Sequence, residues 1–304
     1  MTTHLALVGP TASGKSDLAF HAALTLGDVE IVSMDSMQVY RDLDIGTAKP
    51  TVAARHAVPH HLVDVVEPDE EWSVVRFQTE ARAAVADIEA RGRRALLIGG
   101  TGLYVQAVID DLRFPGESPD LRSELEGWTA EPGGVSAAYA ELEAADPVAA
   151  ARIDPQNARR IVRALEVFRL TGEPFSSFGP GVGVFGPTAF EVSMAGVWLP
   201  RATLARRIDQ RMDAMRTAGL VEEVTALQGR LSRTARQAIG YKELLDAIEH
   251  GEDLDEAFAL VTRRTRSFAR RQRMWFRRDP RITWLGAADN PCALSPSLLA
   301  LWGA

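Results

Sequence analysis

The sequence predicts an α/β fold, in which helices cover a parallel β-sheet and a helical segment is inserted between two strands. Two observations predict this class. Apolar, β-rich segments recur with helical patterns between most of them, which is typical of a parallel sheet. The first segment, residues 5–8, leads into a glycine-rich loop and an amphipathic stretch at residues 16–26. That order is the order of a strand–loop–helix phosphate-binding unit.

The spacing of these segments predicts two parts. Strands are expected at residues 5–8, 30–34, 61–65, 95–98, 192–199 and 282–285. The β-rich segments stop between Phe114 and Ala189, where a Pro-Gly break at residues 115–119 precedes helical stretches and a glycine-rich loop at residues 179–186. We therefore expect a core of residues 1–114 and 190–304, and a helical insertion of residues 115–189.

The loop after the first segment fits the Gly-x4-Gly-Lys-[Ser/Thr] pattern of a phosphate-binding loop, or P-loop, in full. It consists of Gly9, Pro10, Thr11, Ala12, Ser13, Gly14, Lys15 and Ser16. Such a loop feeds a helix N-terminus, and its successive backbone N–H groups cradle a diphosphate or triphosphate. Lys15 is expected to neutralise phosphate oxygens, and Ser16 to hold Mg²⁺.

The acidic residue that usually accompanies a P-loop is absent from its expected place. In ATPases and GTPases a second apolar strand ends in an Asp that holds Mg²⁺, but residues 95–98 lead into Gly-Gly-Thr-Gly at residues 99–102. The segment at residues 30–34 ends instead in Asp35. This position predicts a carboxylate at the carboxyl edge of the sheet, where open α/β folds bind ligands.

A helix with one apolar face is expected after Pro200, because apolar residues recur at positions 204, 208, 212 and 215. Arg207 and Arg211 then lie four residues apart on a neighbouring face. Both guanidinium groups could reach one phosphate; the alternative is a surface arginine ladder.

The composition excludes several classes of protein. A chain of 304 residues with 46% hydrophobic content can bury a substantial core. The single cysteine, Cys292, excludes an internal disulfide framework and a cysteine-based zinc cluster. There is no basic N-terminal segment followed by a signal-length apolar run, and no apolar stretch of transmembrane length, so we expect a cytoplasmic protein with no membrane partner.

The net charge of −7 hides a basic segment near the C-terminus. Between Arg263 and Arg281 there are nine arginines and one acid, so this segment carries about +8 and the rest of the chain about −15. Such polarity is expected when one face meets a polyanion. Interleaved aromatic residues at positions 268, 275 and 276 suit stacked bases as well as core packing. A solvated helix face is the alternative.

Six further motifs follow the P-loop in order. They lie at residues 35–41 (Asp-Ser-Met-Gln-Val-Tyr-Arg), 44–50 (Asp-Ile-Gly-Thr-Ala-Lys-Pro), 59–62 (Pro-His-His-Leu), 99–104 (Gly-Gly-Thr-Gly-Leu-Tyr), 159–166 (Arg-Arg-Ile-Val-Arg-Ala-Leu-Glu) and 237–243 (Gln-Ala-Ile-Gly-Tyr-Lys-Glu). With these motifs the chain resembles the tRNA dimethylallyltransferases, also called isopentenyl-diphosphate:tRNA transferases. It resembles their bacterial type, because the zinc-binding C-terminal module of the eukaryotic members is missing.

The resemblance implies transfer of a dimethylallyl group from dimethylallyl diphosphate to N6 of the adenosine immediately 3′ of the anticodon in tRNA, with release of pyrophosphate. It also implies a nucleotide-kinase-like core and an insertion that contacts the anticodon stem-loop. The P-loop would then hold the leaving pyrophosphate and would not serve ATP hydrolysis.

The resemblance also assigns roles to residues. Asp35 becomes the general base or hydrogen-bond acceptor for the adenine amino group, and Thr101 its partner on the neighbouring strand end. Lys15, the P-loop amides, Mg²⁺ on Ser16 and Arg211 would stabilise the leaving diphosphate. The target base would be flipped out of its stack. The residues implied to contact tRNA are Asp35, Ser36, Met37, Gln38, Thr101, Arg122, Gln156, Asn157, Ala158, Arg159, Arg160, Gln237, Gly240, Tyr241, Lys242, Arg270, Arg273 and Arg277.

Two other functions fit parts of the sequence. A P-loop small-molecule or nucleotide kinase would use the same core, but it needs neither the arginine-rich segment nor the insertion. A non-catalytic RNA-binding module explains the arginines but leaves Lys15, Asp35 and Thr101 without a role. His60 and His61 are not expected to bind a metal, because adjacent residues point to opposite sides of a strand. We expect the protein to be a monomer.

Overall fold

The computed structural model describes residues 4–110, 112–179 and 181–303, and it divides the chain into two compact units. The core unit comprises Met1–Asp110 and Phe185–Ala304, and the insertion unit comprises Asp111–Val184. The boundaries lie four to five residues before those expected at 114/115 and 189/190.

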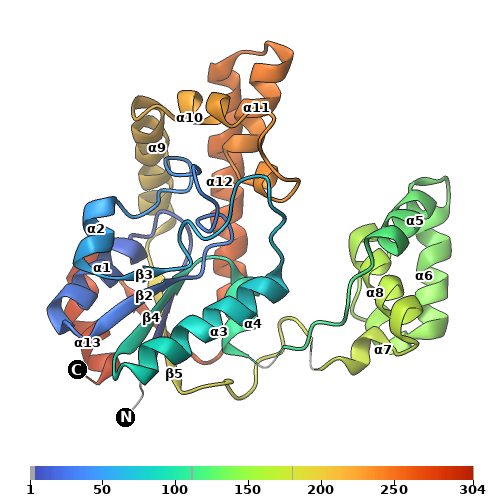
Figure 1. Cartoon of the computed structure of the whole chain (residues 1–304), viewed down its shortest axis with the longest axis horizontal. Helices are drawn as coiled ribbons and strands as arrows, with labels where there is room; N and C mark the ends of the chain where they lie inside the picture. Colours follow the sequence, from blue (N-terminus) through green and yellow to red (C-terminus); the bar gives the residue numbers. More distant parts are fainter. Residues whose placement is uncertain (1–3, 111, 180, 304) are drawn as a thin grey trace. The chain divides into compact units, whose positions relative to one another are not determined.

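The core unit is built on a six-stranded parallel sheet (Figure 1). Its strands are β1 (His4–Val8), β2 (Val29–Ser33), β3 (His60–His61), β4 (Arg94–Gly99), β5 (Val192–Trp198) and β6 (Ile282–Gly286). Their order in the sheet is β3-β2-β4-β1-β5-β6. The predicted α/β class, with a parallel sheet carrying a P-loop, is therefore confirmed.

Alternate side chains of the central strands pack into two separate cores, as expected for strands buried on both faces. Leu5 and Leu7 of β1 lie in one core with apolar residues of α1 (Lys15–Leu26) and α13 (Ser295–Trp302). Ala6 and Val8 lie in the other core, which also contains residues of α3 (Val74–Ala90) and α4 (Gly102–Ile109). The sheet is thus covered by helices on both sides.

A group of helices extends the second core at the carboxyl side of the strands. It consists of α9 (Arg201–Thr217), α10 (Leu220–Ala226), α11 (Tyr241–His250) and the long α12 (Leu254–Phe276) (Figure 1). The apolar positions predicted on α9 are all buried. Shorter elements are α2 (Val52–Ala57) and the 3-10 turns η2 (Ala235–Gln237) and η3 (Pro291–Leu294).

The third strand is shorter than the expected segment at residues 61–65. It ends at His61 because Leu62 and Asp64 adopt left-handed backbone conformations, with φ of 60° and 57°. A polar network holds this turn, since the Asp64 carboxylate accepts hydrogen bonds from Lys49 Nζ and Arg55, both at 2.5 Å. The β-prone composition of the segment gave no sign of these distant partners.

The insertion unit is helical and has a core of its own. Its helices are α5 (Pro119–Ala130), α6 (Gly134–Ala145), α7 (Pro147–Ala150) and α8 (Ala158–Thr171), followed by the 3-10 turn η1 (Phe175–Ser177). Leu125, Leu142, Ile161 and Leu165 are fully buried in that core. The Ser118 side chain caps α5, and Pro119 follows as its first residue.

A buried carboxylate organises the base of the insertion unit. Glu166 of α8 is fully buried and accepts a hydrogen bond from the Ser118 amide at 2.8 Å. Arg122 binds it through two guanidinium nitrogens, and Arg163 through one at 2.9 Å. Burial alone would raise the pKa of Glu166, but these hydrogen bonds and charges hold that pKa below its ordinary value.

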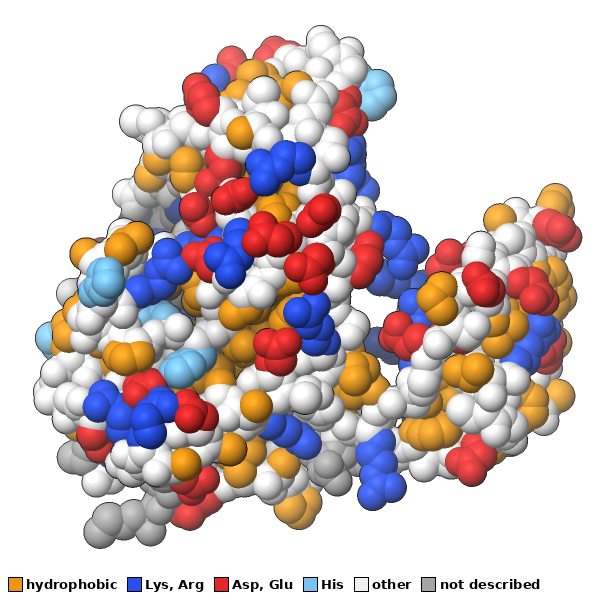
Figure 2. Space-filling model, viewed as in Figure 1, with side chains coloured by type: hydrophobic (Ala, Val, Ile, Leu, Met, Phe, Trp, Pro, Cys, Tyr) orange, Lys and Arg blue, Asp and Glu red, His pale blue; other side chains and the backbone are white. Residues whose placement is uncertain are grey.

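Acidic and basic side chains lie next to one another over much of the viewed surface (Figure 2). Many of them form exposed ion pairs, such as Arg41 with Glu67 and Arg230 with Asp42. No helix in the described parts of the chain has the length and apolarity required to span a membrane.

Candidate active site

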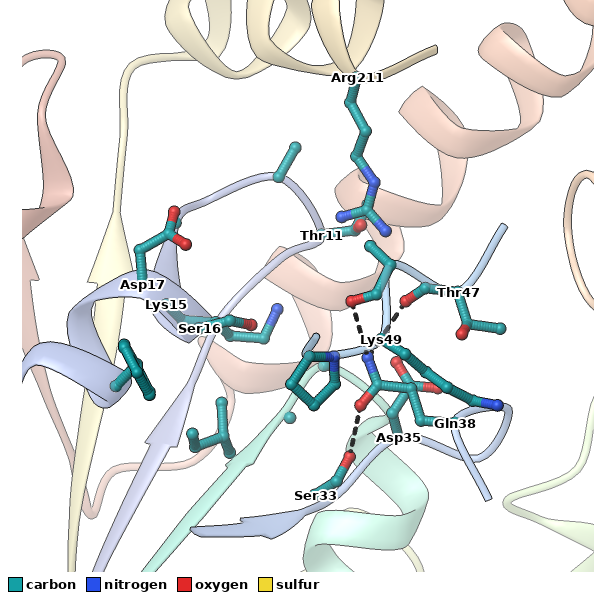
Figure 3. Close-up of a pocket in the computed structure, with 18 of the residues that line it drawn as sticks. Thr11, Lys15, Ser16, Asp17, Ser33, Asp35, Gln38, Thr47, Lys49 and Arg211 are labelled. Atoms are coloured by element: carbon teal, nitrogen blue, oxygen red, sulfur yellow. Dashed lines mark hydrogen bonds between the residues drawn. The ribbon is translucent and has the colours of Figure 1, made fainter. Parts of the chain in front are cut away.

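A cavity of about 570 Å³ lies at the carboxyl edge of the sheet. The P-loop after β1, Ser33 and Asp35 after β2, and Gly99 and Gly100 after β4 form one side of it. Residues of the loop at 47–51, of α9 and of α12 form the other sides (Figure 3). Its size is in the range of small-molecule sites, and all its lining residues belong to the core unit.

The P-loop contains two residues in left-handed backbone conformations. Ala12 has φ of 60°, and Gly14 has φ of 76° immediately before α1 begins. Gly14 is required for space as well, because a Cβ there would lie 2.4 Å from the Pro291 ring. The guanidinium of Arg207 also braces the loop, since its Nε donates to the Ala12 carbonyl at 2.9 Å.

Two cationic side chains line the cavity. Lys15 extends from the start of α1, and among the described residues its one hydrogen-bond partner is the Pro10 carbonyl, at a long 3.3 Å. Burial lowers the pKa of Lys15 to about 8, although the Asp35 charge opposes this shift. Arg211 approaches from α9, and no hydrogen-bond partner of its guanidinium occurs among the described residues. Burial also lowers the pKa of Arg211. The two cations are therefore placed to receive an anion.

Asp35 supplies the carboxylate of the site. Its Oδ1 accepts the Met37 amide at 2.9 Å, which fixes the side chain in an Asx-type turn instead of a helix N-cap. Asp35 lines the same cavity as Lys15 and Arg211. One carboxylate oxygen is thus tied to the backbone, while no hydrogen bond to the other occurs in the described chain.

Thr101 lies near the cavity but is not one of the described residues that line it. It follows Gly100 at the end of β4 and precedes α4, where its side chain makes no capping hydrogen bond. Since β2 and β4 are neighbours in the sheet, Asp35 and Thr101 extend from adjacent strand ends, as predicted.

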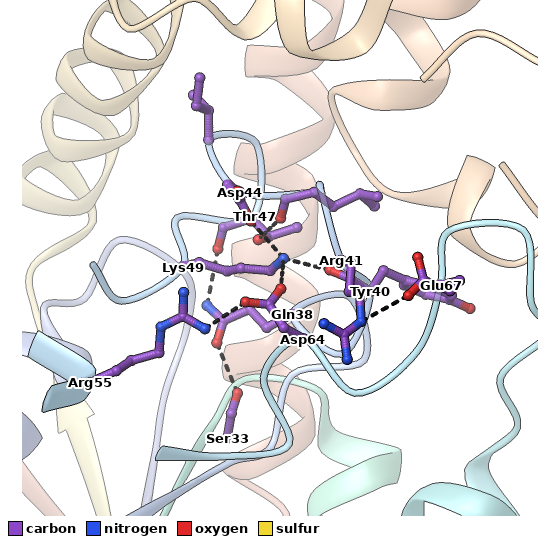
Figure 4. A network of polar contacts seen from close by, with 12 residues as sticks. Ser33, Gln38, Tyr40, Arg41, Asp44, Thr47, Lys49, Arg55, Asp64 and Glu67 are labelled. Atoms are coloured by element: carbon purple, nitrogen blue, oxygen red, sulfur yellow. Dashed lines mark hydrogen bonds and ion pairs between the residues drawn. The ribbon is translucent and has the colours of Figure 1, made fainter. Parts of the chain in front are cut away.

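A polar network holds the loop at residues 44–50, which forms a wall of the cavity (Figure 4). Gln38 accepts from Ser33 Oγ at 2.9 Å and donates to the Thr47 carbonyl at 3.1 Å. Lys49 Nζ contacts the Tyr40 carbonyl, Asp44 and Asp64. The Gln38 amide and the Lys49 ammonium are therefore committed to internal bonds, although tRNA contact was predicted for Gln38.

The same loop is held from its other side by Glu223 of α10. Its carboxylate accepts the amides of residues 44, 45 and 46, the shortest at 2.8 Å. The Tyr241 hydroxyl also donates to Glu223, and the Tyr241 side chain is fully buried. The Tyr241 side chain is occupied by packing against the loop, so its placement does not support the predicted tRNA contact. Gly240 is buried as well, with φ of 102°, whereas Gln237 is exposed and Lys242 half-buried.

The arginines between positions 263 and 281 differ in their partners. Arg264 and Arg266 form ion pairs with Glu243 and Asp209, and Arg281, just beyond α12, pairs with Asp110 and Asp279. Arg273 is 3.7 Å from the centre of the Trp198 ring and donates to the Leu199 carbonyl. Arg263 and Arg270 are exposed, and no partner of either occurs in the described chain. The exposed Arg277 lies 5.9 Å from the Trp198 ring. The segment is therefore only partly an open basic surface.

The predicted RNA-contacting residues of the insertion unit gather at the start of α8. Gln156, Arg159 and Arg160 are exposed there, and Asn157 caps the helix by accepting the Arg160 amide. Ser36 and Met37 of the core unit are half-buried. Arg122 differs from the prediction, because its guanidinium is bound to Glu166.

The two histidines face different partners. His61 Nε2 is 2.7 Å from the Glu30 carboxylate, whereas His60 lines the cavity and its Nδ1 is 2.7 Å from the Val58 carbonyl. Burial lowers the pKa of His60. In the described chain no group of three His, Cys, Asp or Glu side chains is arranged to hold a metal ion.

Two contributors to the site were not predicted from the sequence. Gln272 of α12 lines the cavity and binds the P-loop, and Glu223 holds the loop at 44–46. Gln272 carried one signal: it is a neutral polar residue four positions from both Phe268 and Phe276, on the apolar stripe of an arginine-rich helix. Glu223 carried none, because it lies among other acidic residues on a short helix.

The fold and the cavity together define a P-loop α/β protein. The sequence matches the family described as IPP transferase over residues 38–279 and that described as isopentenyl transferase over residues 1–58. A tRNA dimethylallyltransferase of Kineococcus radiotolerans is 49% identical over 309 residues, covering 98% of this chain and 95% of that protein. One of Bifidobacterium longum is 46% identical, covering 95% and 90%.

Solved structures give the same result. The tRNA isopentenylpyrophosphate transferase of Bacillus halodurans superposes with a TM-score of 0.71 at 38% identity, covering 100% of this chain and 97% of that one. A eukaryotic dimethylallyltransferase described as acting on tRNA superposes with a TM-score of 0.80 at 27% identity, covering 99% and 80%. The chain belongs to the tRNA dimethylallyltransferase family.

Proposed function

We propose that this protein transfers a dimethylallyl group from dimethylallyl diphosphate to N6 of the adenosine immediately 3′ of the anticodon in tRNA, with release of pyrophosphate. One observation carries the proposal. The P-loop, Lys15 and Arg211 surround a cavity that also contains the Asp35 carboxylate. An anion site and a proton acceptor therefore share one space, as a transfer from a diphosphate to an amine requires.

The diphosphate half of the reaction uses the cations. As the allylic C–O bond breaks, negative charge grows on the diphosphate oxygens, and Lys15, Arg211 and the P-loop amides stabilise it. The half-buried position of Lys15 strengthens this interaction because water screens it less.

The amine half of the reaction uses Asp35. The adenine nitrogen forms a bond to the allylic carbon and must lose a proton, and the free oxygen of Asp35 is the acceptor. The Asx-type bond to Met37 fixes the direction of that carboxylate. Thr101, on the adjacent strand end, would contact the incoming base.

Oxygen groups fit the Mg²⁺ expected at Ser16. The exposed Ser16 hydroxyl and the Asp17 carboxylate both line the cavity, and such hard ligands suit this ion. When bound, Mg²⁺ would neutralise diphosphate oxygens. Since no all-protein cage exists in the described chain, Ser16 would bind the ion together with waters and the substrate.

The tRNA partner would be bound by both units through their exposed arginines. In the core unit these are Arg263 and Arg270 of α12 and Arg277 directly after it, and in the insertion unit Arg159 and Arg160 together with Gln156. We propose that the protein acts as a cytoplasmic monomer.

Incubation of the pure protein with labelled dimethylallyl diphosphate, Mg²⁺ and tRNA, in the absence of ATP, tests this function. We expect label in the tRNA and equimolar pyrophosphate. A product that forms only with ATP and carries a new phosphate would instead indicate a kinase. Stable RNA binding without either product would indicate a binding module.

A further inference from the structure

Gln272 of α12 joins two loops that belong to different halves of the candidate site. Its side chain is 6% exposed. The Oε1 accepts the Thr11 amide of the P-loop at 2.8 Å, and the Nε2 donates to the Gly100 carbonyl after β4 at 2.9 Å. One carboxamide thus uses its acceptor and one of its donors to bridge the P-loop and the β4 end.

The β4 end is shaped to receive this helix. A Cβ on Gly100 would lie 2.3 Å from Gln272 Nε2, and a Cβ on Gly102 would lie 2.3 Å from the Trp275 ring. A side chain at Gly102 would therefore clash with the Trp275 ring, and one at Gly100 would displace the Gln272 carboxamide. The glycines on either side of Thr101 therefore permit α12 to approach, and α12 in turn limits where Thr101 can lie.

Other residues keep α12 against the P-loop. Ala269, three residues before Gln272, packs in a small cluster with Leu204 and Ile208 of α9, and Ala12 of the P-loop contacts that cluster. Phe268 of the same inner face lines the cavity. The inner side of α12 thus packs against the P-loop and forms part of the cavity wall.

The outer side of the same helix carries the exposed arginines. At about 100° per residue, Arg263, Arg270 and Arg277 fall roughly 140–180° away from Gln272 around the axis. A polyanion on that side and the site on the other side therefore contact one rigid 23-residue helix.

We propose that Gln272 is a positioning residue, which holds the diphosphate-binding loop and the Thr101-bearing strand end at a fixed separation. The inference rests on the proposed function, in which these two loops hold the donor and the acceptor base. Transfer requires the allylic carbon and the amine to lie about 3–3.5 Å apart, so a small shift of one loop is costly. Since α12 carries both Gln272 and the outer arginines, tRNA binding and alignment of the site depend on the same element.

Two substitutions at Gln272 test the inference, with one control. Gln272→Met keeps the length of the side chain but removes both hydrogen bonds. Gln272→Glu keeps the acceptor for Thr11, yet its ionised form cannot donate to Gly100. Thr265→Val is the control, because Thr265 is also buried on the inner side of α12, seven residues earlier, and its substitution also removes a polar group.

Five measurements distinguish alignment from general damage. For Gln272→Met we expect single-turnover transfer at saturating substrates to fall about 10–10²-fold, with the Kd for tRNA unchanged. Affinity for inorganic pyrophosphate should fall, and amide exchange at residues 9–14 and 99–102 should accelerate. Burial raises the pKa of a carboxyl at position 272, so Gln272→Glu should recover toward wild type as the pH falls and the acid regains its donor.

Each possible result bears on the inference. Wild-type transfer, pyrophosphate affinity and amide exchange in Gln272→Met, or a flat ratio of Gln272→Glu to wild type across pH, would overturn it. Equal losses in Thr265→Val would also overturn it, because any change in the α12 core would then have the same effect. If the wild-type protein transfers no dimethylallyl group but Gln272→Met still weakens pyrophosphate binding and frees both loops, the proposed function fails while the positioning role of Gln272 stands.

Discussion

Lys15 makes donor binding sensitive to pH. Because its pKa is about 8 in the ligand-free site, the side chain loses its charge as the pH rises through that value. We expect kcat/KM for dimethylallyl diphosphate to fall above about pH 8, since this ratio reports ionisations of the free enzyme.

A pH series of initial rates at low donor concentration measures this effect. Lys15→Arg provides the comparison, because arginine stays charged throughout the range. The variant will be slower, but its profile should stay level through pH 8 to 9.5. An identical alkaline limb in both proteins would assign that ionisation to another group.

Asp35→Asn tests proton acceptance. The amide keeps the shape of the side chain and its oxygen can still accept the Met37 amide, but it no longer offers an anionic acceptor. We expect single-turnover transfer to slow by about 10²–10⁴-fold, with little change in tRNA affinity. Near-normal transfer would leave Asp35 with a positioning role and move proton acceptance to water or pyrophosphate.

The site residues that the sequence predicted share one property: their partners are near in the chain or follow from strand order. The P-loop is a continuous motif, and Asp35 is placed by its position after a strand. Glu223 and Gln272 could not be found in this way, since they contact residues 178 and 261 positions away, respectively. Only the packing of α10 and α12 determines those contacts.

At the scale of the elements, the arginines of α12 expected to contact tRNA must be distinguished from those that stabilise the fold. Replacing Arg263, Arg270 and Arg277 with Gln should weaken tRNA binding, because each lost phosphate contact reduces counterion release. We expect the slope of log K against log salt to become shallower by about 0.7–0.9 per lost contact. Arg273 is left intact, since its stacking on Trp198 contributes to the fold.

A second triple variant, with the same change in net charge, is the control for that experiment. Arg91, Arg206 and Arg230 all form exposed ion pairs outside α12, and such pairs contribute little to stability. Their replacement with Gln should leave the salt slope near that of wild type. Equal slopes in both triple variants and wild type would mean that the α12 arginines form only a solvated face.

The element boundaries were predicted unevenly. The strands of the sheet centre and the apolar face of α9 follow from local periodicity, and the structure has both. The third strand was predicted too long, because the ion pairs of Lys49 and Arg55 with Asp64 impose left-handed turns on β-prone residues. Such competition between local preference and distant charge is invisible in a single segment.

At the scale of the whole molecule, the separate core of the insertion unit permits its stability to be changed alone. Glu166→Gln removes the charge that holds Arg122 and Arg163, and breaking a buried ion pair typically costs about 3–5 kcal/mol. We expect residues 112–179 to exchange amide protons faster and tRNA affinity to fall, while pyrophosphate affinity stays normal.

Glu124→Gln is the matched control in the same unit. The Glu124 carboxylate is exposed, and its ion pair with Arg169 is long, at 3.4 Å. Hydrogen exchange, resolved by segment, reports both variants. Faster exchange in the core unit of Glu166→Gln would show that the two units do not unfold independently.

The bond between Thr11 and Gln272 also has a consequence for the order of events during synthesis. The P-loop leaves the ribosome early, yet its brace is 261 residues further along the chain. At a synthesis rate of about 5–20 residues per second, roughly 13–50 s pass between synthesis of the loop and synthesis of Gln272. The central strand β1 also lacks its neighbour β5 during this time, since β5 follows the insertion in the chain. The helices of the insertion can fold before the sheet is complete. A chain released before residue 272 would therefore carry the whole phosphate-binding motif with an unbraced loop, so incomplete products should not sequester pyrophosphate in the cell.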